Sequence, residues 1–320
     1  MATEVTTSTA GRALAQPAVE RFGVRRWIEI LVFILPAFVL FSVFVVVPVV
    51  QAVHYSLYAW SGLGALTDYV GLGNYREALG DPAFRQAMRH NGMLVFLSLT
   101  LQLPLALGVA LLLNRPLRGR TLLRLIFFTP YVLSEAITAI LFVQILQPNG
   151  LADQTLKGAG LGGANQLWLA DLNLVFYTLF LVITWKYIGF AIILFLAGLQ
   201  GVPAELHEAA EMDGASSWAT LRYVTLPLLG PTIRIWAFLS IIGSIQLFDL
   251  AWIMTKGGPA GASSTMATYM VDNGLNSLRM GYATAVAVIL FLICFVVSLF
   301  YQVFVLRRDI SGPTSRMARA

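Results

Sequence analysis

The feature that most constrains the fold is a series of six long apolar runs in a chain of 320 residues. A helix needs about twenty apolar residues to cross the hydrocarbon core of a membrane. Three of the runs carry no charge and three carry one or two charges; in chain order the six are Ile30–Val50, Gly92–Leu113, Leu122–Leu146, Leu174–Gly201, Ile235–Met254 and Ala283–Leu306. The sequence therefore predicts an all-α polytopic membrane protein with six transmembrane helices.

Composition supports the same interpretation. Hydrophobic residues make up 58% of the chain and charged residues 12%, whereas about a quarter of an average soluble domain is charged. The net charge of +5 does not indicate nucleic-acid binding, because the basic residues flank the apolar runs instead of alternating with aromatics. The single cysteine, Cys294, leaves no internal disulfide possible and is expected to pack as an inert side chain. The first run is too long for a signal peptide and lacks a small-residue cleavage site.

The positions of lysine and arginine predict the orientation. With the N-terminus inside, fourteen basic residues lie on the cytoplasmic side and six on the outer side, and cytoplasmic loops are the more basic ones. The connection 114–121 is the clearest marker, since it holds three arginines and no acid. We expect a flexible cytoplasmic N-terminus at 1–26, a transmembrane domain at 27–308 and a cytoplasmic tail at 309–320.

A polar loop at about 201–232 interrupts the apolar sequence between the fourth and fifth runs and falls on the cytoplasmic side. Good helix formers between Glu205 and Met212 predict a first short helix that Pro203 begins. Gly214 allows a turn that a β-carbon would penalise, and residues 215–223 predict a second helix. We expect Leu226-Pro227 and Pro231 to end that second helix before the next span.

The same loop carries a motif. Glu208-Ala209-Ala210, with Gly214 four positions later and Val224-Thr225-Leu226-Pro227 beyond it, resembles the cytoplasmic loop through which ABC importer permeases contact their ATPase. The resemblance extends over about residues 27–308 to permeases of the carbohydrate importer family, the maltose and glycerol-phosphate type. Its other motifs are Gly71–Tyr75, Arg118-Gly119-Arg120, Phe127–Tyr131, Ala197–Gln200, Phe248-Asp249, Thr255–Pro259 and Gly281–Ala283.

The resemblance implies a type I ABC importer permease fold in a bacterial inner membrane, in contact with lipid. It also implies four kinds of partner: a second homologous permease, two ATPase subunits that bind ATP and magnesium, an extracytoplasmic solute-binding protein and a transported sugar. No cofactor is expected in this chain itself. The outer segments near Val70–Tyr75 and Gly257–Tyr282 would receive the binding protein. The residues implied in ATPase coupling are Glu208, Ala209, Ala210, Asp213, Gly214, Leu226 and Pro227.

Charged residues inside apolar runs are candidates for a transport path, because burying them in a membrane costs at least a few kcal/mol. Aromatic rings beside such groups suit a sugar, whose hydroxyls bind the polar group while the ring covers an apolar face. The candidates are Trp185, Lys186, Gln246, Asp249 and Trp252. Structural alternatives remain open: Lys186 pairs with Glu135 or Asp249, Glu135 caps amides freed by Pro130, and Asp249 is a hydrated helix end.

No catalytic or metal-binding set is visible. The chain contains no Gly-Lys-Ser/Thr phosphate-binding loop and no G-x-S-x-G, and its three histidines lie far apart. The chain is therefore not expected to be an enzyme, and energy would come from another polypeptide. The alternatives are a secondary transporter, which predicts inverted repeats and ion-linked charges, and a polytopic membrane enzyme, which predicts paired catalytic residues at one depth. An exporter is disfavoured because exporters do not use this loop pattern.

Overall fold

The computed structural model describes residues 24–160 and 167–306, with side chains described from residue 31 onward. Within these ranges every regular element is a helix, apart from a single antiparallel bridge between Tyr58 and Tyr69. Most of the expected flexible N-terminus and all of the expected tail lie outside the described residues. The chain divides into two compact units, Met1–Val50 and Gln51–Ala320, which are described separately.

The first unit contains α1 (Val24–Phe41), a π-helical turn η1 (Ser42–Val46) and the beginning of α2 (Val47–Tyr55). Together they form an apolar helix over Leu31–Tyr55 with a mean hydropathy of 2.8. A helix that is apolar on all sides and of this length is typical of a membrane span. The first expected span is therefore present as a helix.

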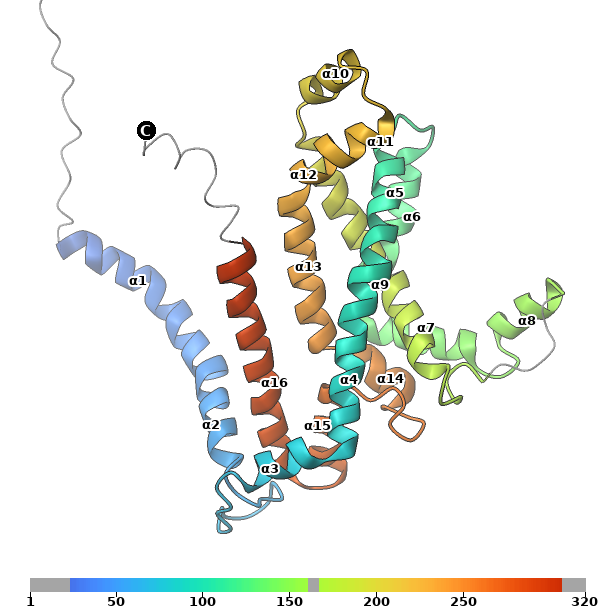
Figure 1. The fold of residues 1–320 in the computed structure, drawn as a ribbon. Coiled ribbons are helices and arrows are strands. Elements are labelled where there is room, and N and C mark those ends of the chain that lie inside the picture. Colours follow the sequence, from blue (N-terminus) through green and yellow to red (C-terminus); the bar gives the residue numbers. More distant parts are fainter. Residues whose placement is uncertain (1–23, 161–166, 307–320) are drawn as a thin grey trace, which may run out of the picture. The chain divides into compact units, whose positions relative to one another are not determined.

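Three further spans in the second unit are continuous helices (Figure 1). One joins α4 (Pro82–Leu97), η2 (Ser98–Gln102) and α5 (Leu103–Asn114); the others are α9 (Val175–Gln200) and α16 (Met280–Tyr301) with η5 (Gln302–Leu306). Asp81 begins α4, because its carboxylate accepts a hydrogen bond from the Ala83 amide at 2.7 Å and Pro82 occupies the first turn.

Two spans are bent. The pair α6 (Arg120–Val132) and α7 (Glu135–Leu146) turns by 99°, and the segment Ser217–Leu228 meets α13 (Gly230–Ile245) at 65°. Pro130 has no amide hydrogen for the helical ladder, and Ser134 starts α7 by accepting a hydrogen bond from the Ile137 amide. By length and composition four helices can cross a membrane, and six can if each bent pair counts as one span.

The fifth predicted run, Ile235–Met254, is not one helix. The helix α13 begins earlier, at Gly230, and ends at Ile245; α14 (Asp249–Thr255) follows as a separate helix. Phe248 between them has φ −132° and ψ −67°, outside the helical region. Hydropathy does not detect this interruption, because Leu247 and Phe248 are as apolar as helical residues would be.

Short helices gather at the two ends of the second unit (Figure 1). At one end lie α10 (Ala204–Met212) and α11 (Ser217–Thr220), beside the connection between α5 and α6. At the other lie α3 (Gly73–Gly80), α15 (Met266–Val271) and η4 (Asp272–Asn276). The helix α8 (Leu151–Gly158) follows α7. The first end matches the predicted cytoplasmic loop and the second the predicted outer loops.

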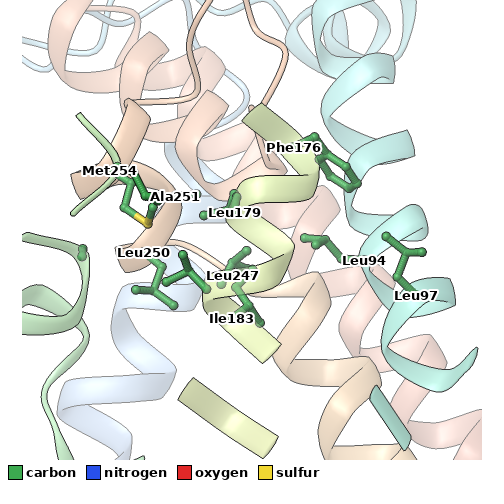
Figure 2. Close-up of a cluster of buried hydrophobic side chains, with 12 residues drawn as sticks. Leu94, Leu97, Phe176, Leu179, Ile183, Leu247, Leu250, Ala251 and Met254 are labelled. Atoms are coloured by element: carbon green, nitrogen blue, oxygen red, sulfur yellow. The ribbon is translucent and has the colours of Figure 1, made fainter. Parts of the chain in front are cut away.

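The interior is held by apolar clusters between the long helices. Figure 2 shows one of them, in which side chains from α4, α9 and α14 meet around Leu94, Leu179, Ile183 and Leu250. A close approach of α6 and α9 adds to this packing: a β-carbon on Gly189 would lie 1.9 Å from the carbonyl oxygen of Phe127. Only glycine fits at that crossing.

Candidate functional site

The polar loop folds as two short helices, as predicted. Pro203 occupies the N-cap of α10, one position before its first helical residue. After α10, Gly214 adopts φ +74°, which glycine reaches at little cost. Ser216 then starts the second helix by accepting a hydrogen bond from the Ala219 amide at 3.3 Å. The imidazole of His207 on α10 lies 3.2 Å from the hydroxyl of Thr225, in the segment that follows the second helix, and joins that segment to α10.

The predicted end of the second helix is correct only in part. The helical path ends before the next span, at Leu228, and Pro231 lies in the first turn of α13, but Leu226-Pro227 does not end it. After α11 a π-helical turn η3 (Leu221–Thr225) leads into α12 (Leu226–Leu228), so the helical path continues through Pro227. Proline fits there because it stands in the first turn of α12, where an amide hydrogen is not required.

The coupling candidates lie on the surface of this loop. The α10 helix, all of which the structure describes, has no buried residue. Glu208, Ala209, Asp213, Gly214 and Pro227 are exposed, while Ala210 and Leu226 are half-buried. Three large apolar side chains on the same loop also face solvent, with Met212 89%, Trp218 67% and Tyr223 72% exposed. Sequence reasoning did not single out these three, although their place beside the motif could have indicated them.

A cavity of about 420 Å³ lies between the long helices of the second unit. Its walls come from α4 with η2, α6 with α7, α9, α13 and the interruption before α14. Apolar and aromatic side chains alternate with polar ones; the lining residues are Leu94, Ser98, Gln102, Tyr131, Glu135, Phe180, Ile183, Tyr187, Phe190, Trp236, Leu239, Ser240, Gly243, Ser244, Gln246, Leu247, Phe248 and Asp249. This mixture is typical of sites that bind small polar molecules.

Two of the five path candidates, Gln246 and Asp249, line this cavity with exposed side chains. The other three do not line it. Trp185 contacts Phe142 with ring centroids 5.0 Å apart, and Trp252 stacks on Phe248 at 5.8 Å.

Lys186 also lies away from the cavity. Its side chain is 2% exposed, and Nζ donates a hydrogen bond of 2.5 Å to the carbonyl of Leu133. That carbonyl belongs to the break between α6 and α7, where the helical ladder leaves carbonyls without amide partners. A cation near the C-terminal end of a helix is favourable as well. Lys186 therefore has a structural role, but with the Leu133 carbonyl at the end of α6 and not through the predicted pairing with Glu135 or Asp249.

Glu135 lines the cavity beside two tyrosines that the sequence analysis missed. The hydroxyl of Tyr187 donates a hydrogen bond to the Glu135 carboxylate, and the ring of Tyr131 stacks on Phe190 with centroids 4.9 Å apart. Tyr187 directly follows the path candidate Lys186, so the sequence could have indicated it as a further candidate. Its orientation toward the cavity depends on the packing of α9 against the bent span and was not visible.

The cavity can hold a hydroxylated molecule, because carboxylates and amides accept and donate hydrogen bonds while aromatic rings cover apolar faces. Over residues 24–160 and 167–306, no group of three or more His, Cys, Asp and Glu side chains could hold a metal ion. The lining of the cavity is that of a site for a small polar molecule.

The motifs predicted to lie outside the membrane have partners within this chain. The buried side chain of Asn74 donates to the carbonyls of Ser56 and Tyr58, each at 2.9 Å. A β-carbon on Gly281 would lie 2.0 Å from the Tyr58 carbonyl oxygen, so the two motifs that contain Asn74 and Gly281 meet the same short segment.

A second connection at this end involves Tyr269 on α15. Its hydroxyl donates to the Asp81 carboxylate at 2.6 Å and lies 2.8 Å from the Tyr282 hydroxyl. Burial alone would raise the pKa of Asp81, but the hydrogen bonds from Tyr269 and the Ala83 amide hold that pKa below its usual value of 3.8. Burial and the hydrogen bond to Asp81 raise the pKa of Tyr269. The Asp81 carboxylate is thus held in its ionised form and the Tyr269 hydroxyl in its protonated form, which is the pair of states that makes this hydrogen bond.

Residues 102–310 match the protein family described as binding-protein-dependent transport system inner membrane component. The chain is 32% identical over 281 residues to the lactose transport system permease protein LacF of Rhizobium radiobacter, covering 87% of this chain and 92% of the relative. It is 31% identical over 294 residues to the sulfoquinovosyl glycerol transport system permease protein SmoG of Agrobacterium fabrum, covering 89% of this chain and 94% of the relative.

A solved structure has the same fold. It is the crystal structure of a bacterial alginate ABC transporter in complex with an alginate pentasaccharide-bound periplasmic protein. One of its chains superposes with a TM-score of 0.77 at 23% identity, over 90% of this chain and 96% of that chain. At this identity the likeness concerns the fold.

Proposed function

Because the chain belongs to the family of binding-protein-dependent transport system inner membrane components, whose type I permease fold it shares, we propose that it forms half of the path of a bacterial sugar importer driven by ATP. The observation that carries this proposal is the cavity, where two carboxylates and several aromatic rings surround a volume of about 420 Å³. The names of two relatives, a lactose and a sulfoquinovosyl glycerol permease, support a sugar or sugar derivative as the solute.

The partners follow from the same assignment. A second, homologous permease completes the path, two separate ATPase subunits bind ATP and magnesium, and an extracytoplasmic solute-binding protein delivers the sugar. The alginate transporter with its periplasmic protein supports such an assembly. Both termini and the α10–α12 loop face the cytoplasm, and the α3, α15 and η4 end faces outward. The more basic side of the membrane protein, where the α5–α6 connection lies, supports this orientation.

The α10–α12 loop contacts the ATPase. Its exposed Glu208 meets a basic partner, Ala209 and Ala210 allow close approach, and Gly214 fixes the angle between the two helices. Exposed Met212, Trp218 and Tyr223 supply the apolar contact area that a stable interface needs. ATP-driven closure of the ATPase subunits moves this loop, and the long helices shift between inward-open and outward-open states.

Within the path, Gln246 and Asp249 touch the sugar, together with Glu135 and Tyr187. Trp252 acts through Phe248, on which it stacks, and Trp185 and Lys186 hold the bent span and α9 in place. The binding is weak, because an importer must release its solute inward.

The path is tested by uptake of radiolabelled lactose and a panel of other sugars into cells that express the complete importer. Asp249→Asn should lower the rate or change the preference among sugars, while Trp252→Phe, a substitution outside the cavity, should have a smaller effect. Unchanged rates and preferences in Asp249→Asn and in Tyr187→Phe would contradict this path.

The coupling role is tested by purifying the complex through a tag on this chain. Glu208→Ala should lose the ATPase subunits or uncouple ATP hydrolysis from uptake, because removing one member of a desolvated charge pair leaves the other unpaired and costs about 2 to 5 kcal/mol. Glu205→Ala is the matched control, since Glu205 is also exposed on α10 but lies outside the motif. Equal uptake and equal ATPase recovery in both variants would refute the coupling role.

A further inference from the structure

The interruption between α13 and α14 leaves backbone groups that a continuous helix would have paired. In such a helix the carbonyls of Ser244 and Ile245 would accept from the amides four residues later, at Phe248 and Asp249. Here the helix ends instead, so these carbonyls need other partners. The residues of the interruption also line the cavity, with Gln246 and Asp249 at its two ends.

Asn91 supplies those partners from α4. Its side chain is 1% exposed, and Nδ2 donates to the carbonyls of Ser244 at 2.8 Å and Ile245 at 3.1 Å. Its Oδ1 accepts from the amide of Met266 at 2.8 Å, in the first turn of α15. All the polar atoms of this amide are thus engaged, and the two elements they reach lie more than 150 residues away in the chain.

Thr265 provides the next bond along the interruption. Its hydroxyl, 1% exposed, donates to the carbonyl of Leu247 at 2.8 Å. The same hydroxyl accepts from the Thr268 amide in the capping box that starts α15. On the other side, the Leu247 side chain packs with Leu179 and Ile183 in the apolar cluster of Figure 2. The interruption is therefore fixed from both sides.

Neither Asn91 nor Thr265 lines the cavity. Their hydrogen bonds nevertheless hold the backbone from which Gln246 and Asp249 project. Without them the buried carbonyls would regain partners most readily by extending α13, which would rotate these two side chains by about 100° for each residue added to the helix. Whether α13 ends at Ile245 or extends further therefore decides which way the side chains of Gln246 and Asp249 point.

We propose that Asn91 and Thr265 are positioning residues of the transport path, which hold the interruption open so that Gln246 and Asp249 face the solute. The role in transport rests on the proposed function, whereas the role in holding the interruption does not. The proposal also connects the cavity to α15 at the outer end, through the bond from Met266 to Asn91 and the capping box of Thr265.

Four variants separate positioning from general support. Asn91→Leu keeps the approximate volume and removes every polar atom, and Thr265→Val removes only the hydroxyl. Thr265→Ser is the conservative rescue, because it restores the bond to Leu247. Thr268→Val is the matched control: it weakens the same capping box but makes no contact with the interruption.

The first readout is the distance between two spin labels in the intact importer complex, in a Cys294→Ser background. One pair joins position 246 to position 181 on α9, and a control pair joins 105 on α5 to 193 on α9. Asn91→Leu and Thr265→Val should at least double the width of the 246–181 distribution, while Thr265→Ser, Thr268→Val and the control pair stay as in the parent. Widths unchanged in both disruptive variants, or equal broadening of the control pair, would overturn the proposal.

The second readout is sugar uptake per ATP hydrolysed, measured without labels and with lactose as the first probe. Asn91→Leu and Thr265→Val should lower this ratio by up to about tenfold, the equivalent of one lost buried hydrogen bond, with ATP hydrolysis nearly unchanged. A parallel loss of both activities would contradict positioning. If the parent complex transports no sugar at all, the proposed function fails, and the spin-label distances still decide whether Asn91 and Thr265 hold the interruption.

Discussion

At the end of the second unit formed by α3, α15 and the beginning of α16, buried polar side chains join segments that are distant in the sequence. Asn74 binds the segment at Ser56–Tyr58, and Tyr269 joins Asp81 to Tyr282. At the opposite end, α10 has no buried residue, and one side-chain hydrogen bond, between His207 and Thr225, connects it to η3 of the same loop. Both ends carry family motifs. The motifs of the first end bond to other segments of the chain, whereas Thr225 of the loop motif bonds only within its own loop.

This difference indicates two kinds of motif: one that stabilises the fold of this chain and one that is available to a partner protein. Asn74 and Gly281 satisfy backbone groups and close approaches inside this chain, so their role is structural even if a binding protein also docks nearby. Glu208 is exposed, and no atom lies within 4 Å of a β-carbon added to Gly214, so neither of these two positions is occupied by packing within this chain. Under the proposed function, both are available to a partner. Substitutions at the α3–α15 end should therefore reduce stability. If the loop couples to an ATPase as proposed, substitutions at the loop end should reduce coupling with little change in stability.

The largest effect on stability is expected from Gly281→Ala. The new β-carbon would lie 2.0 Å from the Tyr58 carbonyl oxygen, a backbone atom that no side-chain rotation can move away. We expect a loss of about 3 kcal/mol or more, at the upper end of overpacking effects. Thermal unfolding of the purified complex, followed by size-exclusion chromatography, measures it. A melting temperature within one degree of the parent would contradict the stabilising role that we assign to the end containing α3 and α15.

Asn74→Leu should come next. It leaves the carbonyls of Ser56 and Tyr58 without their donor, and a buried polar group without a partner costs about 1 to 3 kcal/mol. The variant should insert into the membrane but unfold at lower temperature. Asn276→Leu is a suitable control, because Asn276 is exposed and bonds only within its own turn. Equal melting temperatures in the two variants would assign no structural role to Asn74.

Tyr269→Phe should cost about 1.5 kcal/mol, the lower end for a hydrogen bond to a charged group, because it removes the donor to the Asp81 carboxylate and the contact with the Tyr282 hydroxyl. This variant also tests how the stability depends on pH in the acidic range. Because the folded pKa of Asp81 is depressed, its contribution is present above the unfolded pKa of about 3.8 and is lost as the pH falls through the lower folded value. The difference between parent and Tyr269→Phe should therefore be constant at neutral pH and shrink below about pH 4. A difference that does not change with pH would exclude Asp81 as the group involved.

Gly214→Ala should have the smallest effect on stability. No atom lies within 4 Å of the added β-carbon, and only the left-handed backbone at φ +74° opposes it, at a cost of about 1 kcal/mol. Because α10 has no buried residue, the loop can shift locally to relieve this strain. The melting temperature of the complex should therefore change very little. Uptake per ATP should fall instead. A fall in melting temperature as large as that of Gly281→Ala would remove the distinction between the two ends.

The same comparison predicts that the two ends lie on opposite sides of the membrane. In a Cys294→Ser background, cysteine at Thr67 or Asn276 should react with an impermeant reagent in intact spheroplasts, since both positions are exposed. Cysteine at Arg118 should react only after lysis. Reaction of the Arg118 position from outside would reverse the orientation.

The sequence alone determined the class of protein, the approximate place of the apolar segments, and the two-helix form of the α10–α12 loop. These features depend on local composition: about twenty apolar residues for a span, helix formers between Glu205 and Met212, and glycine at position 214. The family resemblance was also readable, because its motifs are short and contiguous. Each of these conclusions needs only neighbours in the chain.

Only the tertiary structure decided which polar residues meet in the cavity and where the helices break. Lys186 was a path candidate by its charge, but its Nζ reaches the Leu133 carbonyl in a bent span more than 50 residues away. The fifth run was a helix by hydropathy, but Asn91 and Thr265 hold it open from α4 and α15. Hydropathy averages side chains along the chain, whereas both outcomes depend on backbone carbonyls and on donors brought to them from distant segments by packing.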